Sequence, residues 1–190
     1  MWNILVDIDH GLFRLINQGL GCNLLDTVFA ELSSLGTWTI ALIALAWLAD
    51  STRRVFWRHL LAMTLALALT GAVSHYLKAT VDRSRPAKTL TDVRIVDRAL
   101  LESRSFPSGH AMTAFFFMTY VALARRRGRV WAILLASGVA FSRVYVGMHF
   151  PADILAGAAL GALGGWSGWI GYTRWLDPAR AAVPVTVPHV

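Results

Sequence analysis

Charged residues are scarce in this chain of 190 residues: they make up 15% of it, against 56% hydrophobic residues. A soluble domain carries about 25% charged residues, so the composition argues against a soluble globular protein. Cys22 is the only cysteine, which excludes an internal disulfide and leaves the redox compartment open. Together with a mean hydropathy of +0.52, these shortages indicate a membrane protein.

Five stretches are apolar enough to cross a hydrocarbon core about 30 Å thick, which needs roughly 20 helical residues. They are residues 26–49, 60–78, 109–124, 130–148 and 150–175, of which the third is the shortest. Because backbone polar groups cannot stay unpaired in lipid, each stretch is expected to be a helix. We therefore predict an all-α fold, an integral membrane bundle of about five transmembrane helices. In the last stretch, glycines recur every fourth residue and predict close helix packing; they are Gly157, Gly161 and Gly165.

The segments outside this membrane domain, which we place at residues 24–175, have other patterns. Residues 1–22 show apolar residues at helical spacing, interrupted by charged ones such as Asp9, and predict an interfacial amphipathic helix. The connector 79–107 is long and charged, so we predict an extracytoplasmic loop with a short helix near residues 93–101. The proline-containing tail 177–190 lacks periodicity and is predicted to be disordered.

Basic residues are shared equally between the two faces of the predicted bundle. On one face, arginines cluster in two short turns, at residues 53–58 and 125–129. On the other face, three of the basic residues belong to polar segments whose predicted functional role, given below, explains their positive charge; they are Lys78, Arg85 and Arg143. We therefore place the arginine turns in the cytoplasm and the polar segments on the extracytoplasmic side of the cell (inner) membrane. This topology accounts for the net charge of +7 without a nucleic-acid partner.

Three short polar segments lie where apolar stretches begin or end. They contain Lys78 and Arg85, then Pro107-Ser108-Gly109-His110, then Arg143, His149 and Asp153. Ser108 can cap the helix that begins at Gly109, and the free amides of such a helix start bind phosphate. Cations near membrane depth are costly unless they face an anion, so Lys78, Arg85 and Arg143 are predicted to bind phosphate oxygens. The alternative is that each cation reaches singly to lipid headgroups.

His149 and Asp153 are four residues apart, so one helical turn brings the carboxylate beneath the imidazole. The carboxylate can then accept a proton from one ring nitrogen and leave the other free to attack, as in a hydrolytic triad with histidine as the nucleophile. A metal site built on two histidines is the alternative, but no third ligand is evident and the nearby cations would repel a metal. We therefore expect no metal and no other cofactor. His75, one turn before Lys78, is expected to pack or to support the site.

The three segments resemble the signature motifs of the type 2 phosphatidic acid phosphatase (PAP2) superfamily. That signature is Lys, six residues, Arg-Pro; then Pro-Ser-Gly-His; then Ser-Arg, five residues, His, three residues, Asp. The chain has the matching residue at every fixed position: Lys78, Arg85, Pro86, Pro107, Ser108, Gly109, His110, Ser142, Arg143, His149 and Asp153.

The resemblance implies metal-independent hydrolysis of a membrane lipid phosphate or diphosphate. His149 would attack phosphorus and become phosphorylated, Asp153 would orient it, and His110 would protonate the leaving oxygen. The other motif residues would hold the phosphoryl oxygens: Lys78, Arg85, Ser108, Gly109 and Arg143. Small bacterial members that dephosphorylate undecaprenyl diphosphate are the most similar in layout, so this substrate is favoured. Phosphatidylglycerophosphate, phosphatidic acid and lipid A 1-phosphate remain alternatives, because the motifs contact only the phosphate.

Three rival classes share part of the pattern. A lipid phosphotransferase would use the same phosphohistidine and pass the group to a lipid hydroxyl. A vanadium haloperoxidase shares the anion-binding motifs, but those proteins are soluble and larger. A non-enzymatic anion transporter would explain the cations but not the spacing of His149 and Asp153. The sequence does not indicate an oligomeric state.

Overall fold

The computed structural model describes residues 2–49, 53–96, 104–125 and 128–177, and within these ranges it is entirely helical. The helices are α1 (Trp2–Asn17), α2 (Asn23–Ala49), α3 (Arg53–Val81), α4 (Pro86–Thr89), α5 (Gly109–Ala124), α6 (Arg129–Tyr145) and α7 (Pro151–Gly171), and a π-helical turn, η1 (Tyr172–Leu176), follows α7. The predicted all-α fold is confirmed for the described residues. The predicted tail falls outside them from residue 178 onward.

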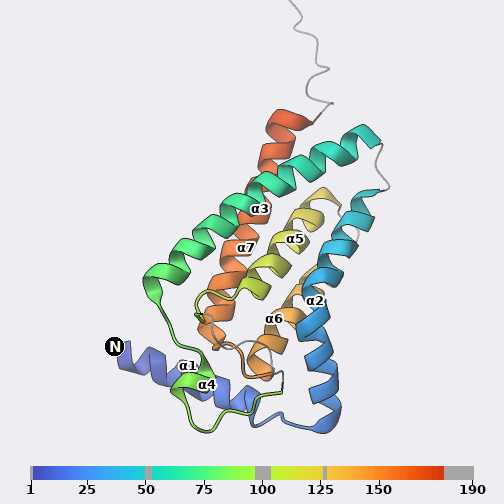
Figure 1. Ribbon diagram of the computed structural model, residues 1–190. Helices are drawn as coiled ribbons and strands as arrows, with labels where there is room; N and C mark the ends of the chain where they lie inside the picture. Colours follow the sequence, from blue (N-terminus) through green and yellow to red (C-terminus); the bar gives the residue numbers. More distant parts are fainter. Residues whose placement is uncertain (1, 50–52, 97–103, 126–127, 178–190) are drawn as a thin grey trace, which may run out of the picture.

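The long helices run back and forth between two ends of the molecule (Figure 1). One end holds α1 and α4, together with the first turns of α2, α5 and α7 and the last turns of α3 and α6. We call it the α1 end. All three polar segments lie at this end, in agreement with their predicted location on one face of the bundle.

The membrane-crossing capacity of the helices is uneven. In the described ranges, two helical segments are long and apolar enough to span a membrane, Arg54–Thr89 and Pro151–Leu176. α2 qualifies only if its parts Asn23–Ser34 and Trp38–Ala46, bent by 62°, count as one span. α5 is apolar but has only 16 residues. A helical membrane protein is therefore supported, while the number of five spans stays a prediction.

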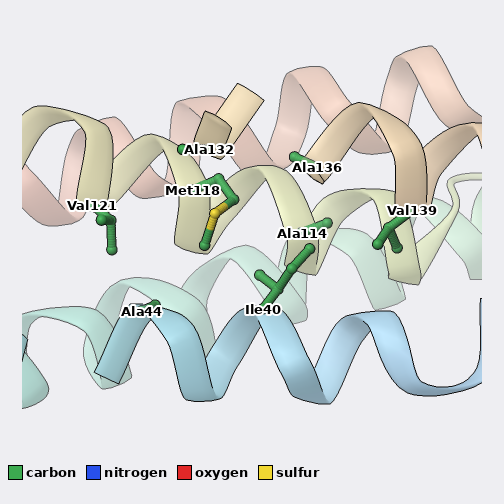
Figure 2. Packing of buried hydrophobic residues seen from close by; sticks show 8 residues of the cluster. All are labelled: Ile40, Ala44, Ala114, Met118, Val121, Ala132, Ala136 and Val139. Atoms are coloured by element: carbon green, nitrogen blue, oxygen red, sulfur yellow. The ribbon is translucent and has the colours of Figure 1, made fainter. Parts of the chain in front are cut away.

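α5 is the central helix, because α2, α6 and α7 all pack against it. Figure 2 shows the core that α2, α5 and α6 share. Its buried side chains are Ile40, Ala44, Ala114, Met118, Val121, Ala132, Ala136 and Val139. Four of these eight are alanines, and such small residues let helix backbones approach closely.

The predicted glycine row brings α7 against α5. A Cβ atom at Gly157, Gly161 or Gly165 would overlap a backbone carbonyl oxygen of α5 or of its cap; these oxygens belong to Ser108, Met112 and Phe116. The prediction of close packing is thus confirmed. Its consequence is that the first turns of α5 and α7 meet, and the amide of Ser108 donates to the carbonyl oxygen of Asp153 at 3.0 Å.

α1 turns a mixed polar and apolar face toward the protein. Asp9, Phe13 and Asn17 are buried at four-residue spacing, with Asp9 only 8% exposed. The exposed side chains of α1 include the charged Asp7 and Arg14 and, in larger number, the apolar Ile4, Leu5, Ile8, Leu12 and Leu15. The helix exists, although it ends at Asn17 and not near residue 22, and its location at the membrane interface stays a prediction. The polar residue Asp9, however, faces protein and not water.

The two ends of the loop between α3 and α5 lie side by side. The amide of Ser105 donates to the carbonyl oxygen of Arg83 at 2.8 Å, and Arg104 Nε lies 2.5 Å from Asp82 Oδ1. Inside the loop, the helix that forms in the described residues is α4. Residues 93–96, which were predicted to begin a short helix, are not helical. The remainder of that predicted helix lies outside the described residues.

Candidate functional site

The predicted site residues come from five separate stretches of chain that meet at the α1 end. Lys78 lies near the end of α3, Arg85 directly before α4, and Ser108 directly before α5. Arg143 lies in the last turn of α6, and Asp153 in the first turn of α7. Contacts described below link these stretches to one another, so a single cluster forms.

Asp153 is completely buried and receives hydrogen bonds on both carboxylate oxygens. Ser105 Oγ donates to Oδ2 at 2.5 Å, and the amide of Phe150 donates to the same oxygen at 3.0 Å. Arg83 Nη1 donates to Oδ1 at 2.8 Å. A carboxylate held on both sides cannot rotate freely, so its orientation toward His149 is fixed.

His149 follows α6 and is 2% exposed. Its Nδ1 lies 3.6 Å from Asp153 Oδ2 and 3.4 Å from Ser105 Oγ, while Arg85 Nη1 lies 3.5 Å from Nε2. Since a guanidinium can only donate, Nε2 is the acceptor and the ring hydrogen belongs on Nδ1. This is the tautomer in which Nε2 carries the free electron pair.

Burial lowers the pKa of His149 to about 4, because a charged imidazole loses its solvation there. The nearby carboxylate of Asp153 raises this pKa, and the charges of Arg85 and Arg143 lower it further. The imidazole is therefore neutral at pH 7, as a nucleophile must be.

The three predicted phosphate-binding cations are held by protein oxygens. Lys78 Nζ donates to the carbonyl oxygen of Pro107 at 2.7 Å, and Arg85 Nη1 donates to that of Met148 at 2.9 Å. Arg143 Nη1 donates to the hydroxyl and the carbonyl oxygen of Ser33 in α2. The carbonyl oxygen of Arg143 accepts hydrogen bonds from the amides of Met148 and His149. Arg85 and Arg143 are thus joined to the segment that carries His149, and Lys78 is joined to the segment before α5.

The start of α5 forms as predicted. Ser108 is buried, and its side chain accepts a hydrogen bond from the amide of Ala111 at 3.4 Å, so it caps the helix. Gly109 and His110 form the first turn and are partly exposed. His110 lies within electrostatic range of Lys78, Arg85, Arg143 and His149. The second histidine is therefore part of the same cluster.

Several residues that touch the site were not singled out by the sequence. Ser105 and Arg83 hold Asp153, and Asp9 of α1 holds Arg83. For Arg83 no signal existed, because nothing in local spacing distinguishes it from Lys88 in the same charged connector. For Asp9 a signal existed, since Asp9, Phe13 and Asn17 form one stripe along α1.

The other histidines near these elements have different environments. His75 is exposed. His59 is buried at the opposite end, with its Nδ1 3.0 Å from the Tyr120 hydroxyl and its ring stacked on Tyr172. Within the described ranges, no three His, Cys, Asp or Glu side chains lie close enough to hold a metal ion together.

Comparison with known proteins identifies the family of this site. The family model of the PAP2 superfamily matches residues 59–177, more than half of the chain. The chain belongs to the PAP2 superfamily. The PAP2 match contains every predicted site residue from Lys78 to Asp153, whereas α1, with Asp9, precedes it.

Among curated PAP2 relatives, the undecaprenyl-diphosphatase of Sulfolobus acidocaldarius is 30% identical over 155 residues, which cover 80% of this chain and 72% of the relative. The lipid A 1-phosphatase of Rhizobium johnstonii is 35% identical over 100 residues. That match covers 50% of this chain and 41% of the relative, so the chain represents less than half of that relative's length.

Two solved structures share the fold. LpxE from Aquifex aeolicus has a TM-score of 0.69 and 30% identity, with 85% of this chain and 94% of that chain covered. The phosphatidylglycerolphosphate phosphatase from Bacillus subtilis has a TM-score of 0.72 and 23% identity, with 93% and 89% covered. At that identity, the second likeness concerns the fold alone.

Proposed function

We propose that this protein is a membrane phosphatase that removes phosphate from a lipid phosphate or diphosphate through a phosphohistidine at His149. One observation carries the proposal: the neutral, buried imidazole of His149 has Ser105 and Asp153 beside Nδ1 and the guanidinium of Arg85, a group suited to bind a phosphoryl oxygen, beside Nε2. The names of the curated relatives, a lipid A phosphatase and an undecaprenyl-diphosphatase, support the same class of reaction.

In the proposed first step, His149 Nε2 attacks phosphorus and the bond from phosphorus to the lipid-side oxygen breaks. His110 gives a proton to that leaving oxygen. The lipid product is then an alcohol if the substrate is a monophosphate, and a lipid monophosphate if the substrate is a diphosphate. The phosphoryl oxygens gain Lys78, Arg85, Arg143 and the amides at the start of α5 as partners. Such fixed donors stabilise the charge spread over the equatorial oxygens, which is the main requirement of phosphoryl transfer.

In the second step, water attacks the phosphohistidine, and His110 takes the proton of that water. Inorganic phosphate leaves and His149 returns to its neutral form. Neither step needs a metal ion, because the three cations and the helix start supply the positive charge.

Undecaprenyl diphosphate is the preferred substrate in this proposal. The undecaprenyl-diphosphatase relative is matched over most of both chains, whereas the lipid A 1-phosphatase match covers half of this chain. Lipid A 1-phosphate is the second candidate, because two lipid A 1-phosphatases from Rhizobium match at 34–35% identity. Phosphatidylglycerophosphate and phosphatidic acid complete the set of substrates to compare.

The active site is proposed to face the extracytoplasmic side of the cell membrane. The first turn of α3 and the first turn of α6, next to which the arginine clusters lie in the sequence, are at the end of the molecule opposite the α1 end (Figure 1). Basic turns of this kind stay in the cytoplasm.

The test is a panel of lipid mono- and diphosphates in detergent, with kcat/KM compared between them and inorganic phosphate measured as product. We expect undecaprenyl diphosphate to rank first and His149→Ala to release no phosphate. A higher kcat/KM for lipid A 1-phosphate would replace the preferred substrate. Release of phosphate by His149→Ala would refute the phosphohistidine. A labelled phosphoryl group found on a second lipid, in place of free phosphate, would identify a phosphotransferase.

A further inference from the structure

Arg83 lies between two carboxylates that are distant in the sequence. Its Nη1 is 2.8 Å from Asp153 Oδ1, and its Nη2 is 2.5 Å from Asp9 Oδ2. The side chains of Arg83, Asp9 and Asp153 are 24%, 10% and 0% exposed. The guanidinium carbon also lies 4.3 Å from the centre of the Phe150 ring. A planar guanidinium held in this way has one available orientation.

Asp9 also contacts the helix that carries Asp153. Its second oxygen, Oδ1, accepts a hydrogen bond from the amide of Ala152 at 2.8 Å. Ala152 lies in the first turn of α7, where a negative charge is stabilised by the helix dipole. One carboxylate of α1 therefore holds both Arg83 and the backbone beside Asp153.

The rest of the inner face of α1 keeps Asp9 in this place. Phe13 packs edge-on against Phe150 with ring centres 5.4 Å apart, and His10 stacks on the same ring at 4.8 Å. Asn17 Nδ2 donates to the carbonyl oxygens of Arg94 and Tyr145, both at 2.8 Å. α1 thus crosses the segment between α6 and α7, which includes His149.

The two oxygens of Asp153 have different partners. Oδ2 faces Ser105 and His149, and Oδ1 faces Arg83. Without the guanidinium, Oδ1 would be buried without this donor, and the carboxylate could turn toward other donors. The consequence would appear at His149, because Asp153 orients its imidazole.

We propose that Arg83 and Asp9 are positioning residues for the phosphatase reaction, and that α1 is thereby part of the catalytic assembly. Arg83 fixes the Asp153 carboxylate, and Asp9 fixes Arg83. Neither residue contacts the phosphoryl group. The inference rests on the proposed function, since it requires that His149 is the nucleophile.

A different result is expected if Arg83 and Asp9 form an ion pair that only stabilises the fold. Its loss would lower the unfolding temperature and leave the reaction of the remaining folded protein unchanged. A positioning pair instead changes the rate at which His149 is phosphorylated. It leaves KM nearly constant, because the phosphate-binding residues are intact.

The experiment measures phosphohistidine formation, kcat, KM and thermal unfolding for the full chain in one detergent. The variants are Arg83→Gln, Arg83→Lys and Asp9→Asn, which keeps the shape of the side chain. The matched control is Arg14→Gln, because Arg14 also joins α1 to the loop, by a 2.9 Å contact with Asp92, but is 46% exposed and does not touch Asp153.

We expect Arg83→Gln to lower kcat and the rate of phosphohistidine formation about 10- to 100-fold, with KM changed less than about twofold. Arg83→Lys keeps the charge without the planar fork and should recover part of the loss. Asp9→Asn should lower kcat about 2- to 10-fold, and Arg14→Gln should behave as the unsubstituted protein does.

Three outcomes would overturn the inference. Asp9→Asn and Arg83→Gln could form phosphohistidine at the unsubstituted rate, they could raise KM alone, or Arg14→Gln could lose as much activity as they do. If Arg83→Gln does not fold, Asp9→Asn decides by the same criteria. An unsubstituted protein that forms no phosphohistidine at His149 would refute the proposed function itself, which is a separate result.

Discussion

Removal of the Ser105 hydroxyl is the sharpest test of how the site works. Ser105 is fully buried, and its Oγ donates to Asp153 Oδ2 at 2.5 Å and lies 3.4 Å from His149 Nδ1. The direct distance from His149 Nδ1 to Asp153 Oδ2 is 3.6 Å, which is too long for a good hydrogen bond. The hydroxyl therefore links the imidazole to the carboxylate, with Nδ1 donating to Oγ and Oγ donating to Oδ2.

The expected magnitude follows from these contacts. A hydrogen bond to a charged group contributes about 1.5–3 kcal/mol, and each loss of about 1.4 kcal/mol in the transition state slows a reaction tenfold. Positive charge develops on His149 as it attacks phosphorus, so the link to the Asp153 carboxylate matters most in the transition state. Ser105→Ala should therefore lower kcat about 10- to 100-fold and change KM little.

The assay is steady-state phosphate release from the preferred lipid, accompanied by thermal unfolding in the same detergent. Ser34→Ala is the control, because Ser34 is exposed and its hydroxyl donates only to the carbonyl oxygen of Glu31 at 3.2 Å among the contacts of the described chain. Ser105→Ala with unchanged kcat and an unchanged unfolding temperature would refute the hydroxyl link. It would show that His149 and Asp153 interact directly during the reaction.

Four further predictions concern the nucleophile, the independence from metal ions, the pH profile and the helix packing. His149→Ala should abolish turnover, and the unsubstituted enzyme should keep its activity in strong chelators; complete loss of activity in EDTA would contradict the mechanism. Because burial lowers the pKa of His149 to about 4, its imidazole stays neutral as pH falls from 7 to 5, so kcat/KM should show no loss centred on the ordinary histidine pKa of about 6.5. A loss centred there would show that His149 titrates normally. Gly161→Ala should destabilise the fold by about 1–3 kcal/mol, because the added Cβ overlaps the Met112 carbonyl oxygen. Gly71→Ala, where no atom lies within 4 Å, should be neutral or stabilising in thermal unfolding; equal effects of the two substitutions would refute the packing argument.

Local signals in the sequence were sufficient to predict the positions of the helices that carry the motifs. α5 begins and ends where predicted, since Ser108 caps its start and a charged turn follows Ala124. α3 is longer than the predicted span at both ends: Arg54 and Arg58 belong to the helix before its apolar part, and the helix continues to Val81 after it. An apolar run marks where a helix can sit in lipid, but it does not mark where the helix ends.

The contacts around Asp153 could not be predicted from local sequence patterns. Asp9 and Arg83 are 74 residues apart, and Ser105 and Asp153 are 48 apart. No periodicity links such positions, so the pairs emerge only from the packing of α1 and the loop against α7. His59 shows the same limit, because its partners Tyr120 and Tyr172 come from two other helices.

The joined ends of the loop between α3 and α5 have a consequence for how relatives diverge. Lys78 holds the carbonyl oxygens of Arg104 and Pro107, and Ser105 is bonded to Arg83, so the loop closes at its base. Apart from Arg85, whose guanidinium donates to the carbonyl oxygen of Met148, residues beyond this closure can be exchanged during evolution without displacing the phosphate-binding cations. The base of the loop, together with Arg85, thus holds the proposed phosphate site in place, while the rest of the loop can change with the lipid that is bound.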